Sequence, residues 1–291
     1  MENVFELNNI HKSYQGETIL KDFSLQLKAG CCYGFLGRNG AGKSTAIKIL
    51  MGMTQFDQGE VKLLGQDPWA IDRSLKAQVG YVSQTQTLPP TATAAELITF
   101  HQKMYPNWRS DDVDMLLTRF EINKNKKVKA LSGGMQKLLA IILALGQDPT
   151  LLILDEPTVG LDPISKQELM DNLLELLLNE NCSIFFSSHI LTDIEKLADK
   201  IGILKGGKLV IDMELDTLKE SVKQIQLDFS DEIPPSFDIQ GLLSIKKIGR
   251  SIILTIKSDD QNIVETIKNK YSGKIKLLDM NLEEIFIELA K

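Results

Sequence analysis

The chain of 291 residues has few of the features that mark secreted, membrane-spanning or nucleic-acid-binding proteins. Its three cysteines, of which Cys31 and Cys32 are adjacent, offer neither a disulfide framework nor a metal-site spacing. No apolar run approaches the length of a membrane span, and the polar start Met1-Glu2-Asn3 is unlike a secretion signal. The net charge is −6 without a long Lys/Arg run, so a broad basic face for nucleic acid is not expected. These absences favour a protein of a reducing cytoplasm, with its cysteines acting as small buried hydrophobes.

Apolar residues make up 43% of the chain and charged residues 25%, which supports a sizeable core. The length suits one large domain with a small appendage. Alternating or continuous apolar patterns predict strands at 4–10, 23–27, 61–64, 79–82, 151–154, 183–187, 201–204 and 209–212. The first two of these are expected to form an antiparallel pair beside the strand at 31–36. Between about 95 and 145 the apolar period is helical, and another amphipathic helix is expected at 164–179.

The stretch Gly37-Arg38-Asn39-Gly40-Ala41-Gly42-Lys43-Ser44 fits the pattern of a phosphate-binding loop. It lies between an apolar segment typical of a buried strand and apolar positions at helical spacing. Its glycines let backbone N–H groups turn towards a polyphosphate, and the helix N-terminus adds its dipole and unpaired donors. Lys43 supplies a charge for the outer phosphates and Ser44 a hydroxyl for Mg²⁺. A chance glycine-rich turn is the alternative, but the flanking strand and helix favour nucleotide binding.

Two adjacent carboxylates, Asp155 and Glu156, follow the apolar run at 151–154. A continuous apolar run is typical of a central parallel strand, and open α/β sheets bind ligands at the carboxyl ends of such strands. Side chains alternate along a strand, so the two carboxylates cannot share one direction while the strand stays regular. We predict that Asp155 holds hydrated Mg²⁺ and that Glu156 reaches an attacking water. A pair of helix N-cap carboxylates is the alternative.

Three other polar positions are ambiguous when each is considered alone. Tyr14, expected on a polar loop closed by Gly16, suits either stacking on an adenine ring or an ordinary loop. Ser132-Gly133-Gly134 opens a helix and suits either an anion-binding helix end or a simple N-cap. His189 follows the strand at 183–187 and suits either a γ-phosphate contact or a surface position.

Taken together, these segments resemble the nucleotide-binding subunit of an ATP-binding-cassette (ABC) transporter over roughly residues 3–217, with every family motif in order. The resemblance implies an α/β fold. A P-loop ABC-type ATPase core, residues 1–217, would combine a RecA-like sheet, an antiparallel β part and a helical signature subdomain at about 86–147. Residues 218–291 would form a small C-terminal α+β domain. There, apolar patterns predict strands near 225–229, 252–256 and 275–277, a helix at 263–271 and a last helix with Asn281 as N-cap.

The resemblance also assigns roles to residues of this sequence. Tyr14 matches the adenine-stacking aromatic, Gln84 the glutamine loop, Asp162 the loop that links two sites of a dimer, and His189 the switch histidine. Residues 131–134 match the signature sequence and Glu156 the catalytic base. The implied catalytic residues are Lys43, Gln84, Glu156 and His189, and the implied Mg²⁺ ligands are Ser44, Gln84 and Asp155. The implied nucleotide-binding residues are Tyr14, Gly37, Arg38, Asn39, Gly40, Ala41, Gly42, Lys43, Ser44, Thr45, Ser132, Gly133, Gly134 and Asp162.

By the same resemblance, ATP and Mg²⁺ are the cofactors, and ATP hydrolysis powers a separately encoded membrane permease. The chain would form a homodimer, or a heterodimer with a second ABC ATPase, and would lie on the cytoplasmic face of the membrane through the permease, without binding nucleic acid. The stretch at 281–286 looks like the tail of bacterial exporter subunits. A non-transport ABC ATPase would show a coiled-coil insertion, tandem cassettes or a basic face. A small-molecule P-loop kinase would lack the signature at Ser132.

Overall fold

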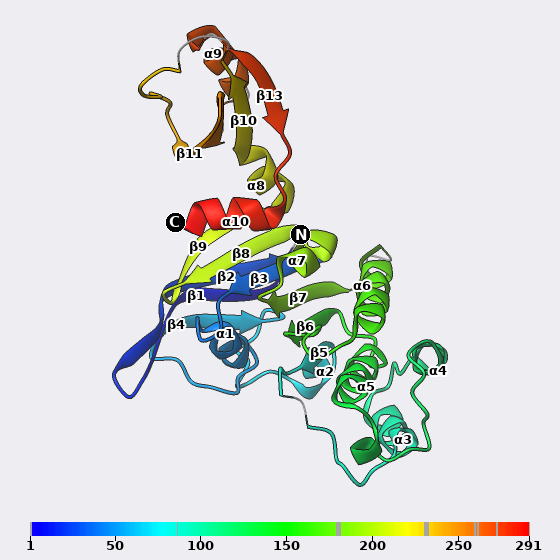
Figure 1. The fold of residues 1–291 in the computed structure, drawn as a ribbon. Coiled ribbons are helices and arrows are strands. Elements are labelled where there is room, and N and C mark those ends of the chain that lie inside the picture. The colour runs from blue at the N-terminus through cyan, green and yellow to red at the C-terminus, as the bar shows by residue number, and fades with distance from the viewer. Residues whose placement is uncertain are drawn as a thin grey trace. The chain divides into compact units, whose positions relative to one another are not determined.

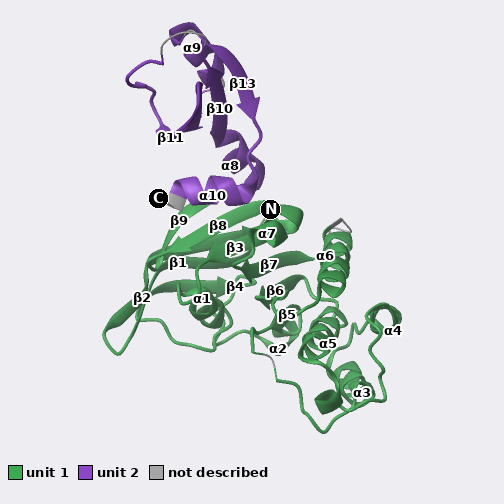
Figure 2. Cartoon of the chain, in the orientation of Figure 1, with its two compact units in different colours: residues 1–212 green, residues 213–291 purple. Residues whose placement is uncertain are grey.

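The computed structural model describes residues 2–85, 87–178, 182–229, 233–258, 260, 262–271 and 273–290. The chain divides into two compact units, Met1–Asp212 and Met213–Lys291 (Figure 2). The division lies a few residues before the predicted boundary at 217. Each unit has its own sheets and helices, which Figure 1 labels.

The centre of the first unit is a six-stranded sheet in the order β5-β6-β7-β3-β8-β9. Its strands are β3 (Cys32–Gly37), β5 (Val79–Val82), β6 (Leu151–Asp155), β7 (Ser183–Ser188), β8 (Lys200–Lys205) and β9 (Lys208–Glu214). The pairs β3–β7, β3–β8, β5–β6 and β6–β7 are parallel. Every residue of β3, β6 and β7 is buried, as expected of central parallel strands with both faces covered. The sheet therefore brings the carboxyl ends of β3, β6 and β7 to one edge.

A second, three-stranded antiparallel sheet has the order β2-β1-β4. It consists of β1 (Asn3–Tyr14), β2 (Glu17–Lys28) and β4 (Gln58–Leu63). The predicted pair of strands does form, but neither strand pairs with β3, whose neighbours are β7 and β8. Instead the two sheets share one apolar core, in which Phe5 lies 5.0 Å from Phe185 and Phe23 lies 5.8 Å from Phe35 between ring centroids. Helix α1 (Lys43–Leu50) contacts strands of both sheets.

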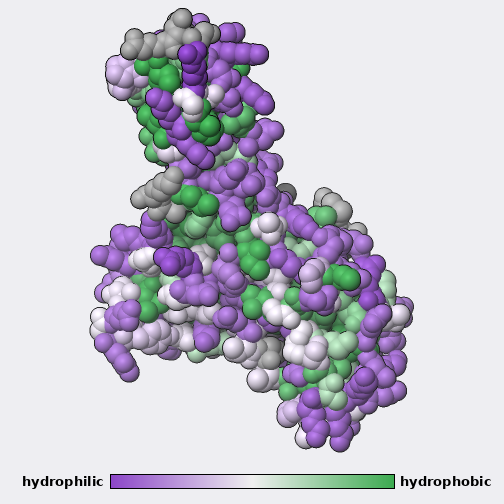
Figure 3. Space-filling model, viewed as in Figure 1, coloured by the Kyte–Doolittle hydropathy of each residue, from purple (hydrophilic) through white to green (hydrophobic). Residues whose placement is uncertain are grey.

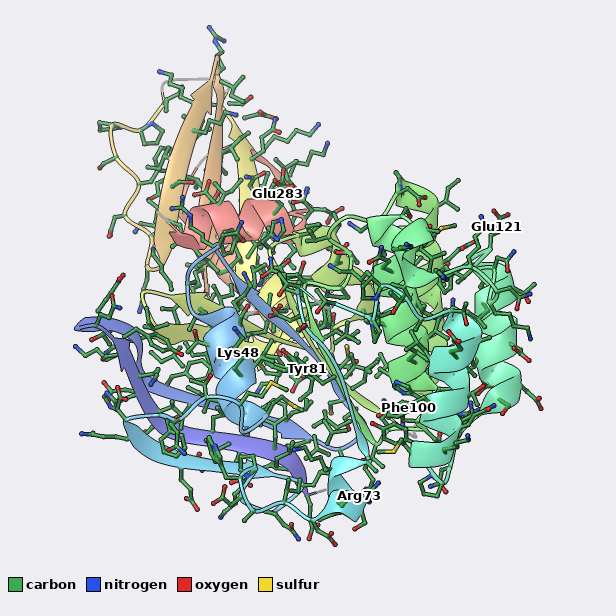
Figure 4. All side chains as sticks on the ribbon, turned by 90° about the horizontal axis from the view of Figure 1, so that it is seen from below. Lys48, Arg73, Tyr81, Phe100, Glu121 and Glu283 are labelled. Atoms are coloured by element: carbon green, nitrogen blue, oxygen red, sulfur yellow. The ribbon has the colours of Figure 1, made fainter. Side chains whose placement is uncertain are left out.

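The predicted helical insertion lies between β5 and β6. It contains α3 (Ala94–Met104), α4 (Ser110–Arg119), a 3₁₀ turn (Val128–Ala130) and α5 (Gly133–Leu145). The short helix α2 (Arg73–Lys76) comes before β5 and is not part of the insertion. Thr93 and Glu96 form a reciprocal capping box that begins α3. In Figure 4, Phe100 and Glu121 mark this helical region, while Tyr81 lies among the strands of the core. The helical region therefore stands to one side of the sheet.

Two further helices, α6 (Pro163–Leu178) and α7 (Leu191–Leu197), precede and follow β7. The predicted helix at 164–179 corresponds to α6, although residue 179 is outside the described residues. Helix α7 packs closely on β3, because a Cβ atom at Gly34 would lie only 2.7 Å from Cδ1 of Ile194. Glycine is therefore the residue that lets this helix approach the phosphate-loop strand.

The second unit is a small α+β fold. Its sheet is antiparallel in the order β11-β12-β10-β13, from β10 (Val222–Asp228), β11 (Leu242–Ile248), β12 (Ser251–Lys257) and β13 (Lys274–Leu278). Helices α8 (Leu215–Ser221), α9 (Ile263–Lys270) and α10 (Leu282–Ala290) complete it. Asn281 is the predicted N-cap of α10: its Oδ1 accepts a hydrogen bond from the N–H of Glu284, 2.9 Å away. The sequence patterns did not reveal β11 or α8.

Hydrophilic side chains cover most of the face drawn in Figure 3, with smaller hydrophobic areas between them. Across the residues that the structure describes, no helix combines the length and the apolar character needed to cross a membrane.

Candidate active site

The predicted phosphate-binding loop joins the buried end of β3 to the first turn of α1. Gly42 caps this helix with a left-handed backbone (φ 110°) and without a side-chain hydrogen bond. A Cβ atom at that position would lie 3.1 Å from the carbonyl oxygen of Ile19, so the turn requires glycine. The first N–H groups of α1 are thus not capped by the preceding side chain, which suits an anion at this end of the helix.

Lys43 is buried at the start of α1, with 6% of its surface exposed. Its ammonium donates hydrogen bonds to the carbonyl oxygens of Gly37 (2.7 Å) and Arg38 (3.5 Å). It also lies 3.1 Å from Oε1 of Glu156. The charge of Lys43 is therefore held inside the loop and neutralised by the carboxylate that follows β6.

Asp155 and Glu156 lie at the end of β6, and each is only 2% exposed. Ser187 of the neighbouring strand β7 holds both residues. Its hydroxyl donates to Oδ1 of Asp155 at 2.5 Å and accepts from the N–H of Glu156 at 3.0 Å. The same N–H is 3.2 Å from the carbonyl oxygen of Ser187. Burial, followed by the negative charge of Asp155, raises the pKa of nearby Tyr81 to about 12, so this phenol stays neutral.

Glu156 has a left-handed backbone conformation, with φ +53°. Such a conformation is uncommon for a residue with a side chain, and it ends the regular alternation of β6. The carboxylate is placed between two cationic or titratable groups. Oε1 faces Lys43, and Oε2 lies 2.7 Å from Nδ1 of His189, whose side chain is 41% exposed. The two adjacent carboxylates therefore have different partners: Asp155 accepts from Ser187, whereas Glu156 faces Lys43 and His189.

A cavity of about 230 Å³ opens over the loop. Its lining comes from the antiparallel sheet, the phosphate loop, the segment after β5 and the segment after β6. The lining residues are Tyr14, Ile19, Arg38, Asn39, Gly40, Gly42, Lys43, Ser44, Thr45, Gln84 and Glu156. Gly37 and Ala41 belong to the same loop without lining the cavity. Residues far apart in sequence therefore meet at one site.

Tyr14 differs from its predicted setting. It is the last residue of β1, not a loop residue, and pairs with Glu17 across a two-residue turn. Gln15 and Gly16 both have positive φ, at 50° and 88°, which is typical of a tight hairpin turn. The Tyr14 ring is 44% exposed, and the ammonium of Lys12 lies 4.7 Å from its centroid.

Asp155 and His189 adjoin Glu156 without lining the cavity, and Ser132, Gly133, Gly134 and Asp162 also lie outside the lining. Ser132 caps α5, where its hydroxyl accepts from the N–H of Met135 at 3.2 Å, and Gly133 and Gly134 form the first turn. Asp162 accepts hydrogen bonds from Ser165, at N (3.0 Å) and Oγ (2.7 Å), and these bonds lower the pKa of Asp162. Within one described chain, Ser132 and Asp162 therefore do not join the residues of the cavity.

Three residues at the site have no signal in the sequence motifs. Ile19, from β2, adds an apolar wall beside Tyr14. Ser187, at the end of β7, connects Asp155 to the backbone of Glu156. Lys137, in α5, donates hydrogen bonds to the carbonyl oxygens of Glu156 and Val159, both at 2.9 Å. Of these three, only Ser187 could have been found from the sequence, because it is a polar residue at the end of a predicted parallel strand.

The ABC transporter family model matches residues 20–159 of the chain. The Bacitracin transport ATP-binding protein BcrA of Bacillus licheniformis is 33% identical over 235 residues, 80% of this chain and 77% of BcrA. The chain belongs to the ATP-binding subunits of ABC transporters. The Nod factor export ATP-binding protein I of Rhizobium johnstonii is 31% identical over 98% of this chain and 94% of that protein.

A solved dimeric structure of an ATP-binding cassette in a post-hydrolysis state, bound to ADP and Pi, matches with a TM-score of 0.65. It is 26% identical and covers 72% of this chain and 98% of that one. The predicted α/β fold of an ABC ATPase is thereby confirmed. As a member of this family, the chain is an ATPase that binds and hydrolyses ATP.

Proposed function

We propose that this ABC transporter subunit hydrolyses ATP in the cavity over the phosphate loop and so powers a separate membrane permease that exports its substrate. The observation that supports the site is the convergence of Tyr14, Lys43, Gln84 and Glu156 from four separate segments on one cavity. Export is suggested by the names of the two relatives, which refer to bacitracin transport and Nod factor export. Through the permease, the chain would be peripheral on the cytoplasmic face of the membrane.

In this proposal the phosphates displace an existing contact. The loop amides and the N-terminus of α1 receive the polyphosphate, and the Lys43 ammonium turns from Glu156 towards it. Tyr14, beside Ile19 at the rim of the cavity, stacks on the base. Release from Lys43 leaves the Glu156 carboxylate free to orient and deprotonate the attacking water. His189 stays within reach of that carboxylate and of the outermost phosphate.

The donor set at the site suits Mg²⁺ that arrives with the nucleotide. Among the residues described, no group of three or more His, Cys, Asp or Glu side chains could hold a metal by itself. Mg²⁺ commonly binds through one or two carboxylates together with substrate phosphates. Ser44 and Gln84 line the cavity, and the buried Asp155 adjoins Glu156. These three residues would hold the ion, which would neutralise charge on the transferred phosphate.

We further propose that each complete site needs two chains. Ser132–Gly134 and Asp162 lie outside the cavity of their own chain, although Ser132 begins a helix that suits an anion. The solved relative is a dimer with bound ADP and Pi. In a two-fold dimer, Ser132 of each chain would close over the nucleotide held by Lys43 of the other.

Mixing two damaged chains tests this arrangement. One chain carries Lys43→Ala and the other Ser132→Arg, so each homodimer has two damaged sites. In a mixed dimer one site collects both changes, and the other joins the intact Lys43 to the intact Ser132. We expect mixing to restore part of the ATPase activity, because one composite site is whole.

A strict requirement for two active sites would hide that recovery, so ATP-induced dimerisation is measured as well. The same mixtures are studied by sedimentation in a Glu156→Gln background, which slows hydrolysis. If folded chains recover neither activity nor dimer on mixing, the shared site is wrong. ATPase activity that is complete in a monomer would also contradict the shared site.

A further inference from the structure

The backbone of Glu156 is held from both sides by groups outside its own strand. The N–H of Glu156 donates to the hydroxyl oxygen of Ser187 at 3.0 Å and lies 3.2 Å from the carbonyl oxygen of Ser187. The carbonyl oxygen of Glu156 accepts a hydrogen bond from Nζ of Lys137 at 2.9 Å. A left-handed conformation at a residue with a side chain persists only where its surroundings enforce it. Ser187 and Lys137 thus bind the peptide groups on both sides of this residue.

Lys137 reaches this position because α5 lies directly against the loop that follows β6. A Cβ atom at Gly134 would lie 3.0 Å from the carbonyl oxygen of Gly160, so the first turn of α5 touches that loop. The ammonium also donates to the carbonyl oxygen of Val159 at 2.9 Å. It therefore binds both ends of the four-residue stretch 156–159. One side chain thus ties the helix that begins at Ser132 to the peptide that follows Glu156.

We propose that Lys137 is a positioning residue for hydrolysis: by holding the carbonyl of Glu156, it keeps the carboxylate aimed between Lys43 and His189. This inference rests on the proposed role of Glu156 as the base. Without the two hydrogen bonds, the carbonyl of Glu156 and the loop up to Val159 lose their tie to α5, while Ser187 still binds the N–H of Glu156. We expect the carboxylate then to be aimed less well. Binding of ATP does not need that placement, because the loop amides and Lys43 belong to another segment.

The environment of the ammonium agrees with a role at the site. Burial lowers the pKa of Lys137, while the charges of Glu156 and Asp155 act in the opposite direction. A lysine placed only for solubility would stay in water, whereas this one gives up solvent to donate to two backbone oxygens.

The test compares Lys137→Met with Lys137→Gln and Lys137→Arg. Met has a side chain of similar length to lysine but no hydrogen-bond donor, whereas Gln and Arg retain donors. Lys129→Met, at an exposed lysine of the same helical region, is the matched control. We expect Lys137→Met to lower kcat about 10- to 100-fold, as the loss of charged hydrogen bonds that act in the transition state implies. ATP affinity should change by less than about twofold, Lys137→Gln or Lys137→Arg should recover part of kcat, and the control should resemble the unaltered protein.

A role through Glu156 is separated from a general loss of packing by repeating Lys137→Met in a Glu156→Gln background. If Lys137 acts only by aiming the carboxylate, it has no further effect once the carboxylate is absent. The inference is overturned by an unchanged kcat, by weakened ATP binding that accounts for the whole effect, or by an equal loss in both backgrounds. If Lys137→Met does not fold, Lys137→Ala, which also lacks the donors, carries the same comparison.

Failure of the underlying proposal has a different signature. Normal turnover of Glu156→Gln alone would show that another group is the base, whatever Lys137 does. Loss of turnover in Glu156→Gln together with normal turnover in Lys137→Met would overturn only the positioning role.

Discussion

The ion pair between Lys43 and Glu156 makes a prediction about the protein without nucleotide. The two side chains are 6% and 3% exposed, and their charged atoms are 3.1 Å apart. Lys43→Met removes the ammonium and leaves a buried carboxylate that keeps its contact with His189. Glu156→Gln is milder, because an amide oxygen still accepts from Lys43, which also keeps its bond to Gly37. We therefore expect the two single changes to differ strongly in stability.

The magnitude follows from the distance and the burial. At an effective dielectric constant of about 20, Coulomb's law gives an attraction of about 5 kcal/mol for charges 3.1 Å apart. Desolvation offsets much of this attraction in the intact pair, but removal of one partner leaves the other's desolvation uncompensated and typically costs about 3–5 kcal/mol. We expect that loss in Lys43→Met. The double variant Lys43→Met, Glu156→Gln should recover about 2–3 kcal/mol of it, since no unpaired charge stays buried.

Urea unfolding followed by tryptophan fluorescence measures this loss of stability in the first compact unit, which contains Lys43 and Glu156. The chain has two tryptophans, Trp69 and Trp108, and both belong to the first unit. Their signal is therefore blind to unfolding of residues 213–291. Unfolding free energies of the single and double variants complete a double-mutant cycle. A cost of less than about 1 kcal/mol for Lys43→Met, or no recovery in the double variant, would refute the argument, because it would place the pair in the range of exposed ion pairs.

Two further changes test other parts of the first unit. Tyr14→Ala should weaken ATP binding about tenfold or somewhat more, because base stacking contributes about 1–3 kcal/mol. Tyr14→Phe should change the affinity little. Equal affinities of all three proteins in a binding titration would show that Tyr14 does not bind the base. His101 is packed against Tyr105 and Trp108, and burial lowers its pKa below 6.5. The unfolded chain then takes up the proton first as the pH falls below about 6.5, so stability decreases with acidification. His101→Phe should flatten that part of the urea-midpoint curve between pH 7 and 5, and an unchanged slope would contradict the assignment.

The parts of the fold that the sequence predicted correctly depend on local pattern. The run at 151–154 is apolar at every position, so a strand buried on both faces was the natural prediction, and β6 is fully buried. The phosphate loop needs only its own glycines, one lysine and a following helix, all contiguous in the chain. Asn281 caps α10 through neighbours three residues away. Each of these features is decided within one or two turns of chain.

Strand pairing is not decided locally. Alternation in 4–10 and 23–27 identifies the face that turns to the core, but it carries no information on which strand lies alongside. The sequence predicts the antiparallel pair beside β3, whereas the pair joins β4 in a separate sheet and meets β3 through the shared apolar core, for example where Phe23 packs on Phe35. The sequence predicts Tyr14 on a loop closed by Gly16, and Gln15-Gly16 is a weaker hairpin signal than Asn-Gly. In the structure, that turn brings the end of β1 to the rim of the cavity.

The conformation of Glu156 has the same kind of origin. Nothing in Asp155-Glu156-Pro157 requires a positive φ, and the partners that stabilise it lie 31 residues after it, at Ser187, and 19 residues before it, at Lys137. Because β6 and β7 are parallel neighbours, Ser187 could be placed near Asp155 once the strand order was known. Lys137 could not, since its contact depends on how α5 of the helical insertion packs on the loop after β6. The motif therefore identifies the carboxylate, whereas tertiary packing decides where that carboxylate points.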